Sequence, residues 1–317
     1  MRRCALLLFA LLLLAAPCRA RVLGVGAGQE FASLAQAEAQ SHPGDVLRLR
    51  SGRYAECVVL HQPDITLEGS GRPDATVLDG VACQGKAAVV VAGPRATLRN
   101  LTLSGVHVPD ANGAGIRAEG GDLLVDHVRF IRNENGILAA NDPQATITIA
   151  DSEFVGNGSC EKACAHGVYI NHIGLLRIER SRFFDTHTAH HIKSRALRTE
   201  IIDCDISDGP GGTASYAIET PNGGALLVHR VRIEKGPLSE NHQAAISIGA
   251  EGVNQATPSL RIEASRFRHD GAYPTSFVRN LSTTPAELVG NEILSGGNAA
   301  GVTMLSGPGG VREGRAR

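Results

Sequence analysis

Apolar and polar residues alternate along much of this chain in a phrase of eight residues that recurs. The clearest copies are Leu123–Phe130, Ile147–Phe154, Leu176–Phe183 and Leu260–Phe267. Each copy carries an apolar residue, a second two positions later, usually a small residue three positions further, and a final large apolar residue. Alternation with a period of two predicts short strands that each bury one face.

A second phrase lies between these copies and centres on one apolar residue, the anchor. The anchors follow one another at steps of 21 to 32 residues: Ile116, Ile137, Val168, Ile192, Ile218, Ile246 and Val278. A period in the mid-twenties with two or three short strands predicts a solenoid in which each period is one coil. A propeller would need hairpin turns, and a leucine-rich repeat would need longer helical halves. We therefore predict an all-β parallel β-helix of about ten coils over residues 21–305.

The two ends of such a stack expose unpaired strand edges that must be covered. We predict a capping helix at Glu30–Ala39, because its apolar residues would share one helical face. These residues are Phe31, Leu34, Ala35 and Ala39. Ser306–Arg317 is rich in glycine and arginine and predicts a disordered tail.

Residues 1–20 read as a secretory signal peptide, with two arginines, a short apolar run and a small residue at the end. A lipid anchor at Cys18 is the weaker alternative. We expect a secreted or periplasmic protein without stable membrane insertion. In an oxidising compartment Cys160 is expected to pair with Cys164, and Cys57 with Cys83, while Cys204 occupies a buried position of the repeat.

Charge adds little to this picture as a whole. With 31 basic and 32 acidic residues, the chain has no overall field that would draw it to nucleic acid or to an anionic membrane. A charged partner must be bound locally.

The opening of the chain resembles a known superfamily. Pro43–Asp45, Gly52–Tyr54 and Ile65–Gly69, followed by the coils, resemble the pectate-lyase-like (pectin lyase fold) right-handed parallel β-helix proteins, in an uncharacterised branch of secreted bacterial proteins. The resemblance implies a right-handed helix and raises the expectation of carbohydrate chemistry. The superfamily contains polysaccharide lyases, hydrolases, esterases and uronate epimerases, and also proteins without known catalysis, so the fold does not select a reaction.

Strict alternation around each anchor would place the residues one before, one after and three after it on the outer face. This brings together His191, Lys193 and Arg195 on one strand. Residues of the neighbouring coils, about 5 Å away, are expected to complete a substrate-binding surface: Tyr169, Asn171, His166, His190, Glu219 and Asn222.

These residue types match the needs of β-elimination or C5 epimerisation in an acidic polysaccharide. Arg195 would neutralise the uronate carboxylate. Lys193 would remove the C5 proton, and Tyr169 or His191 would act as the acid. In the alternative interpretation Lys193 and Glu219 form an ordinary cross-strand ion pair, and the chain is a non-catalytic surface or periplasmic polymer-binding protein. The chain has no tryptophan and few aromatic residues, which disfavours a neutral polysaccharide.

We predict no cofactor and no metal ligands. Calcium is a weaker alternative, because the outer face offers Glu219 and Glu251 but no larger group of carboxylates. Zinc on His166, His187, His190 and His191 is weaker still, since no carboxylate stands at a convincing spacing.

Overall fold

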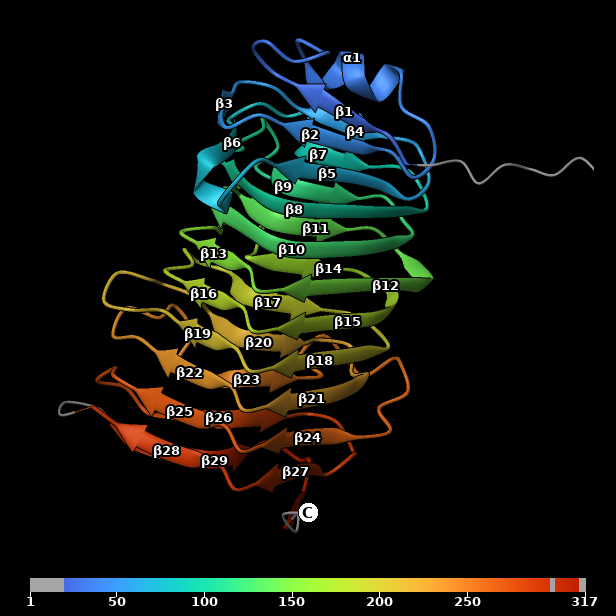
Figure 1. Cartoon of the computed structure of the whole chain (residues 1–317). Helices are drawn as coiled ribbons and strands as arrows, with labels where there is room; N and C mark the ends of the chain where they lie inside the picture. The colour runs from blue at the N-terminus through green and yellow to red at the C-terminus, as the bar shows by residue number, and fades with distance from the viewer. Residues whose placement is uncertain (1–19, 297–299, 314–317) are drawn as a thin grey trace, which may run out of the picture.

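The computed structural model describes residues 20–296 and 300–313. The predicted signal peptide therefore lies outside the described residues, apart from Ala20. The strands stack as rungs from a short helix at one end to β27 near the other (Figure 1). All strand pairings between coils are parallel, which confirms the β-helix and rules out a propeller.

Three faces enclose the core. One is a ten-stranded sheet in which each coil contributes one strand: β4 (Val58–Leu60), β7 (Ala87–Val91), β9 (Ala114–Ala118), β11 (Asn135–Ala139), β14 (Val168–Ile170), β17 (His190–Ser194), β20 (Tyr216–Thr220), β23 (Ala244–Ile248), β26 (Thr275–Asn280) and β29 (Val302–Ser306). We refer to it as the ten-stranded sheet.

The other two faces belong to a twenty-stranded sheet that bends around a corner. Its first face consists of β1 (Val22–Val25), β2 (Val46–Leu49), β5 (Ile65–Gly69), β8 (Arg95–Ser104), β10 (Asp122–Ile131), β12 (Asp142–Ala150), β15 (Ile173–Glu179), β18 (Arg198–Ile202), β21 (Ala225–His229), β24 (Leu260–Glu263), β27 (Ala286–Val289) and β30 (Val311–Glu313). The long strands β8 and β10 continue into its second face, which adds β3 (Gly52–Tyr54), β6 (Thr76–Asp79), β13 (Glu153–Val155), β16 (Arg182–Phe184), β19 (Asp205–Ser207), β22 (Arg232–Lys235), β25 (Arg266–His269) and β28 (Glu292–Ser295).

The corner between these two faces explains the small residue in the first phrase. One residue per coil turns there with a positive φ, such as 48° at Asp151 and at Arg180. The small residue that follows points inward and bonds along the stack: the amide of Val128 donates to Oγ of Ser152, and the amide of Ser152 donates to Oγ of Ser181. These bonds help to hold a backbone conformation that is otherwise unfavourable for residues other than glycine.

Large apolar residues at the end of the first phrase stack in the core. The rings of Phe130, Phe154 and Phe183 lie parallel, with centroids 4.4 and 4.5 Å apart. The disulfides Cys57–Cys83 and Cys160–Cys164 are both present, and Cys204 is buried and unpaired.

The capping helix differs from the prediction. α1 spans Leu34–Ala39 and buries Leu34 and Ala37, whereas Ala35 and Ala39 are exposed. The helix begins at Leu34 and not at Glu30, because Ser33 caps it: the Ser33 side chain accepts a hydrogen bond from the amide of Gln36.

The expected disordered tail, Ser306–Arg317, lies partly outside the described residues, which end at residue 313. Within the described part, β30 pairs with β27 and continues the stack. Among the described residues, no helix is long and apolar enough to cross a membrane.

Candidate functional site

The predicted site residues gather on the outer face of the ten-stranded sheet. The register aligns Tyr169 of β14 with Lys193 of β17, and Lys193 with Glu219 of β20. Asn171 and Asn222 flank this row at its edge, where their side-chain amides donate to the carbonyls of Ala139 and Gly252. These residues lie together on this face, with one exception.

The exception is His191, which lies in the interior rather than on the outer face. Its side chain is fully buried, with Nε2 2.8 Å from Oδ1 of Asp208 and Nδ1 2.7 Å from Oγ1 of Thr186. The outward position belongs to His190, whose Nε2 lies 2.9 Å from Oε2 of Glu219.

Strict alternation fails here because the strand is irregular just before each anchor. The register pairs His190 with Tyr216 and Ile192 with Ile218 but omits the residues between them. The omitted column points inward and is mostly small: Gly115, Gly136, Gly167, His191, Ala217, Ala245 and Phe277. A Cβ on Gly136 would lie 2.7 Å from the ring of Phe154.

Lys193 is held between two carboxylates. Its Nζ lies 3.2 Å from Oε2 of Glu219 and 2.6 Å from Oε1 of Glu251. Burial alone would raise the pKa of Glu219, but His190 and Lys193 outweigh it and hold this pKa below the usual value. Lys193 therefore forms ion pairs with two carboxylates at once.

Arg195 forms the second cation of the cluster. Its Nη2 lies 2.5 Å from Oε2 of Glu251, and its guanidinium lies 5.3 Å from the centroid of the Tyr169 ring. Lys193 approaches the same ring at 5.8 Å. Nη1 of Arg195 is buried and has no hydrogen-bond partner within the described residues. Two cations thus lie near the Tyr169 ring. One of them, Arg195, has an N–H donor that is not used within the described residues.

Three rings form a ladder along the stack. The His190 ring lies 4.8 Å from that of His166 and 5.1 Å from that of Tyr216. The amide of Tyr216 donates to Nδ1 of His190, so the neutral form of His190 carries its proton on Nε2, facing Glu219. Burial, reinforced by the charges of His190, Lys193 and Arg195, places the pKa of His166 well below its usual value, so His166 is neutral.

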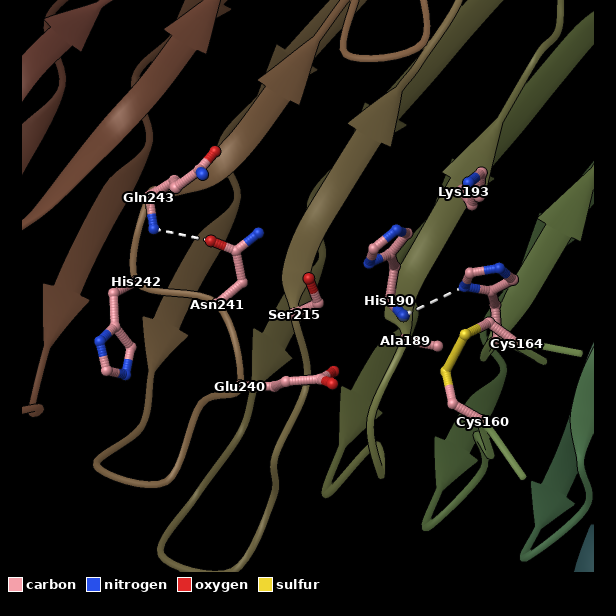
Figure 2. Close-up of a pocket in the computed structure, with 11 residues that line it drawn as sticks. Cys160, Cys164, Ala189, His190, Lys193, Ser215, Glu240, Asn241, His242 and Gln243 are labelled. Carbon is pink, nitrogen blue, oxygen red and sulfur yellow. Dashed lines mark hydrogen bonds between the residues drawn. A yellow bond between two sulfur atoms is a disulfide. The ribbon is translucent and has the colours of Figure 1, made fainter. Parts of the chain in front are cut away.

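The cluster opens into a cleft of about 590 Å³. Figure 2 shows Lys193 at one end and His242 at the other, with the Cys160–Cys164 disulfide along one side. The lining residues are Cys160, Cys164, His166, Ala189, His190, Lys193, Ser215, Glu240, Asn241, His242 and Gln243. The loop Glu240–Gln243 was not predicted, although this polar insertion lengthens the step before the anchor Ile246.

A buried polar network lies behind the cleft and was also missed. Nζ of Lys235 donates to the carbonyl of Ser215 and to Oγ of Ser239, at 2.7 and 2.6 Å. Burial lowers the pKa of Lys235 from 10.5 to about 8, despite the opposing charges of Asp208 and Glu234.

The depressed pKa of Lys235 predicts a pH effect on stability. The folded protein penalises the charged amine, so this cost is fully present below pH 8 and disappears as the pH rises to about 10.5. Relative to Lys235→Met, the wild type should gain ~3 kcal/mol of unfolding free energy across this range. Urea unfolding at several pH values measures the difference. Lys86→Met, at a half-exposed lysine, serves as a control and should show no such trend. A pH-independent difference for Lys235→Met would contradict the assignment.

The residues considered for metals do not form a metal site. His191 bonds to Asp208 inside the core, and both Glu219 and Glu251 are neutralised by Lys193. This arrangement does not fit calcium, which needs several uncommitted oxygens. Among the described residues, a grouping with ligand spacing occurs elsewhere, at Asp126, His127 and Asp151. Asp151 there is paired with Arg180.

No protein-family model matches the chain, and no curated protein matches it. Among solved structures, the A-module of mannuronan C-5 epimerase AlgE4 from Azotobacter vinelandii aligns with a TM-score of 0.46 and 14% identity, over 86% of this chain and 91% of that module. A mutant of the PL6 family alginate lyase AlyGC aligns with a TM-score of 0.43 and 14% identity, over 89% of this chain and 39% of that enzyme.

The strand topology defines this chain as a parallel β-helix protein. The similarity to the two enzymes is distant and concerns the fold. It assigns no reaction to this chain.

Proposed function

We propose that this chain is an extracytoplasmic carbohydrate-active protein that acts on an acidic polysaccharide as a lyase or a uronate C5-epimerase. The observation that supports it is the cluster of Lys193, Arg195, Tyr169 and His190, of which Lys193 and His190 line the cleft. Two cations within reach of one ring suit a uronate carboxylate. Two disulfides are typical of secreted or periplasmic proteins.

In the proposed reaction Arg195 neutralises the carboxylate and so makes the C5 proton more acidic. Lys193 first passes a proton to the carboxylate of Glu251, 2.6 Å away, and the neutral amine then accepts the C5 proton. His190 replaces His191 as the acid, because His190 lines the cleft whereas His191 is buried in the core. Tyr169 is the alternative acid. Reprotonation at C5, instead of loss of the leaving oxygen, would give epimerisation.

The test is incubation of the mature protein with a panel of acidic polysaccharides that includes alginate and mannuronan. Unsaturated uronates are followed by ultraviolet absorbance, and C5 exchange is followed in deuterated water. Lys193→Ala should lower either signal by about 10²-fold. Lys86→Ala, in the turn before β7 and paired with Glu119, should retain it. An equal signal from Lys193→Ala would contradict the role of Lys193.

A non-catalytic polymer binder is the second candidate. It is favoured by the charge balance of the cluster, in which two carboxylates already neutralise Lys193 and Arg195. Retained binding of the panel, with neither absorbance nor C5 exchange, would support the binder and overturn both enzymatic readings.

A further inference from the structure

Glu251 already bridges the two cations of the cluster. Its Oε1 lies 2.6 Å from Nζ of Lys193, and its Oε2 lies 2.5 Å from Nη2 of Arg195. Both oxygens of one carboxylate are therefore engaged by two cations. The carboxylate of a uronate sugar would make the same contacts.

The backbone that carries Glu251 is anchored, whereas its side chain is not enclosed. The amide of Glu251 donates to the carbonyl of Pro221, and the amide of Gly249 donates to that of Thr220. The side chain of Glu251 is 41% exposed, compared with 4% for Glu219. Rotation of the side chain into solvent therefore needs no movement of the loop. An ion pair at such exposure adds little stability, so its loss costs little.

We infer that Lys193 and Arg195 form a carboxylate-binding subsite that Glu251 occupies until a uronate carboxylate displaces it. The identity of the ligand rests on the proposed function. Once Glu251 leaves, Arg195 offers the released Nη2 together with its buried, unpartnered Nη1. Two neighbouring donors on one guanidinium match a carboxylate.

Displacement also changes Lys193. With Glu251 gone and the uronate on Arg195, Lys193 keeps Glu219 as its remaining partner at 3.2 Å. One of the two carboxylates that pair with Lys193 has then left. Glu251 thus makes the subsite selective, because a ligand with a carboxylate replaces the two ion pairs that Glu251 gives up, and a neutral sugar does not.

The test measures binding of D-glucuronate by calorimetry, with D-glucose as the neutral counterpart. A resident competitor lowers the apparent affinity by the fraction of time that the subsite is open. Glu251→Ala should therefore bind glucuronate on the order of tenfold more tightly than the wild type. Glu251→Gln, which keeps the shape without the charge, should fall between them. Adding Arg195→Ala to Glu251→Ala should remove the binding.

The matched control is Glu292→Ala, which removes an exposed glutamate that pairs with Arg266 on another face. It should leave glucuronate binding unchanged. Unchanged or weaker binding by Glu251→Ala, or no glucuronate binding by any variant, overturns the subsite. Tighter binding without turnover on the polysaccharide panel retains the subsite and overturns the proposed reaction, so the two failures are distinguishable.

Discussion

The His191→Ala variant is expected to lose about 3–5 kcal/mol of its unfolding free energy, because it leaves the buried carboxylate of Asp208 without the hydrogen bond from the His191 ring and leaves a cavity in the core. Asp208 is 3% exposed and would keep the amide of Gly236, which donates to its Oδ2. Urea unfolding followed by far-ultraviolet circular dichroism measures this loss.

The neighbouring His190→Ala variant is expected to behave in the opposite way. Under the proposed function its turnover should fall by a factor on the order of 10³, because the acid beside Glu219 is gone. Its unfolding free energy should change by no more than about 1 kcal/mol, since the hydrogen bond that its ring accepts from the amide of Tyr216 lies at the edge of the cleft and the backbone bond to His166 is kept.

The two adjacent histidines thus lie in different environments, His191 in the core and His190 at the cleft. If His190→Ala unfolds easily while His191→Ala loses turnover without losing stability, the structural assignment of the two side chains is wrong. His191→Asn is a further check, because it can still donate to Asp208 and should recover part of the stability.

Much of the fold could be predicted because the same pattern of apolar positions recurs from coil to coil of a solenoid. The apolar positions of Leu123–Phe130 and its copies define inward columns, and each copy supports the others. The end caps have no copies, so α1 and β30 were placed less well. The start of the helix depends on the single cap residue Ser33. β30 forms by pairing with β27, and a sequence rich in glycine gives no pattern that predicts this pairing.

The strands that carry the candidate site could be predicted, but not which of the two adjacent histidines points outward. Alternation assumes a regular strand. The irregularity before each anchor turns the residue directly before the anchor inward instead of outward. The small residues in that column, such as Gly115 and Gly136, were the available signal, because an outward position has no need to be small. Glu251 could not be assigned as the partner of Lys193, since it reaches the cluster from a loop 58 residues away in sequence.

Phe183 and Phe184 offer a matched test of the core stack. Phe183 is 1% exposed, stacks on Phe154 at 4.5 Å and meets the edge of the His191 ring at 6.5 Å. Phe184 is 39% exposed. Phe183→Ala is expected to cost about 3–5 kcal/mol of unfolding free energy, because it removes buried apolar contacts and leaves a cavity. Phe184→Ala should cost less than about 1 kcal/mol.

The loss at Phe183 should also be local at first, since each coil of a solenoid contacts mainly its neighbours. Amide hydrogen exchange should therefore rise earliest in β13, β16 and β19, which carry the rungs on either side of Phe183. Exchange that rises equally in β5 and β2, four and five coils away, would show that the solenoid unfolds as one unit. Equal destabilisation by Phe184→Ala would show that the stack of phenylalanine rings does not dominate the stability of this region.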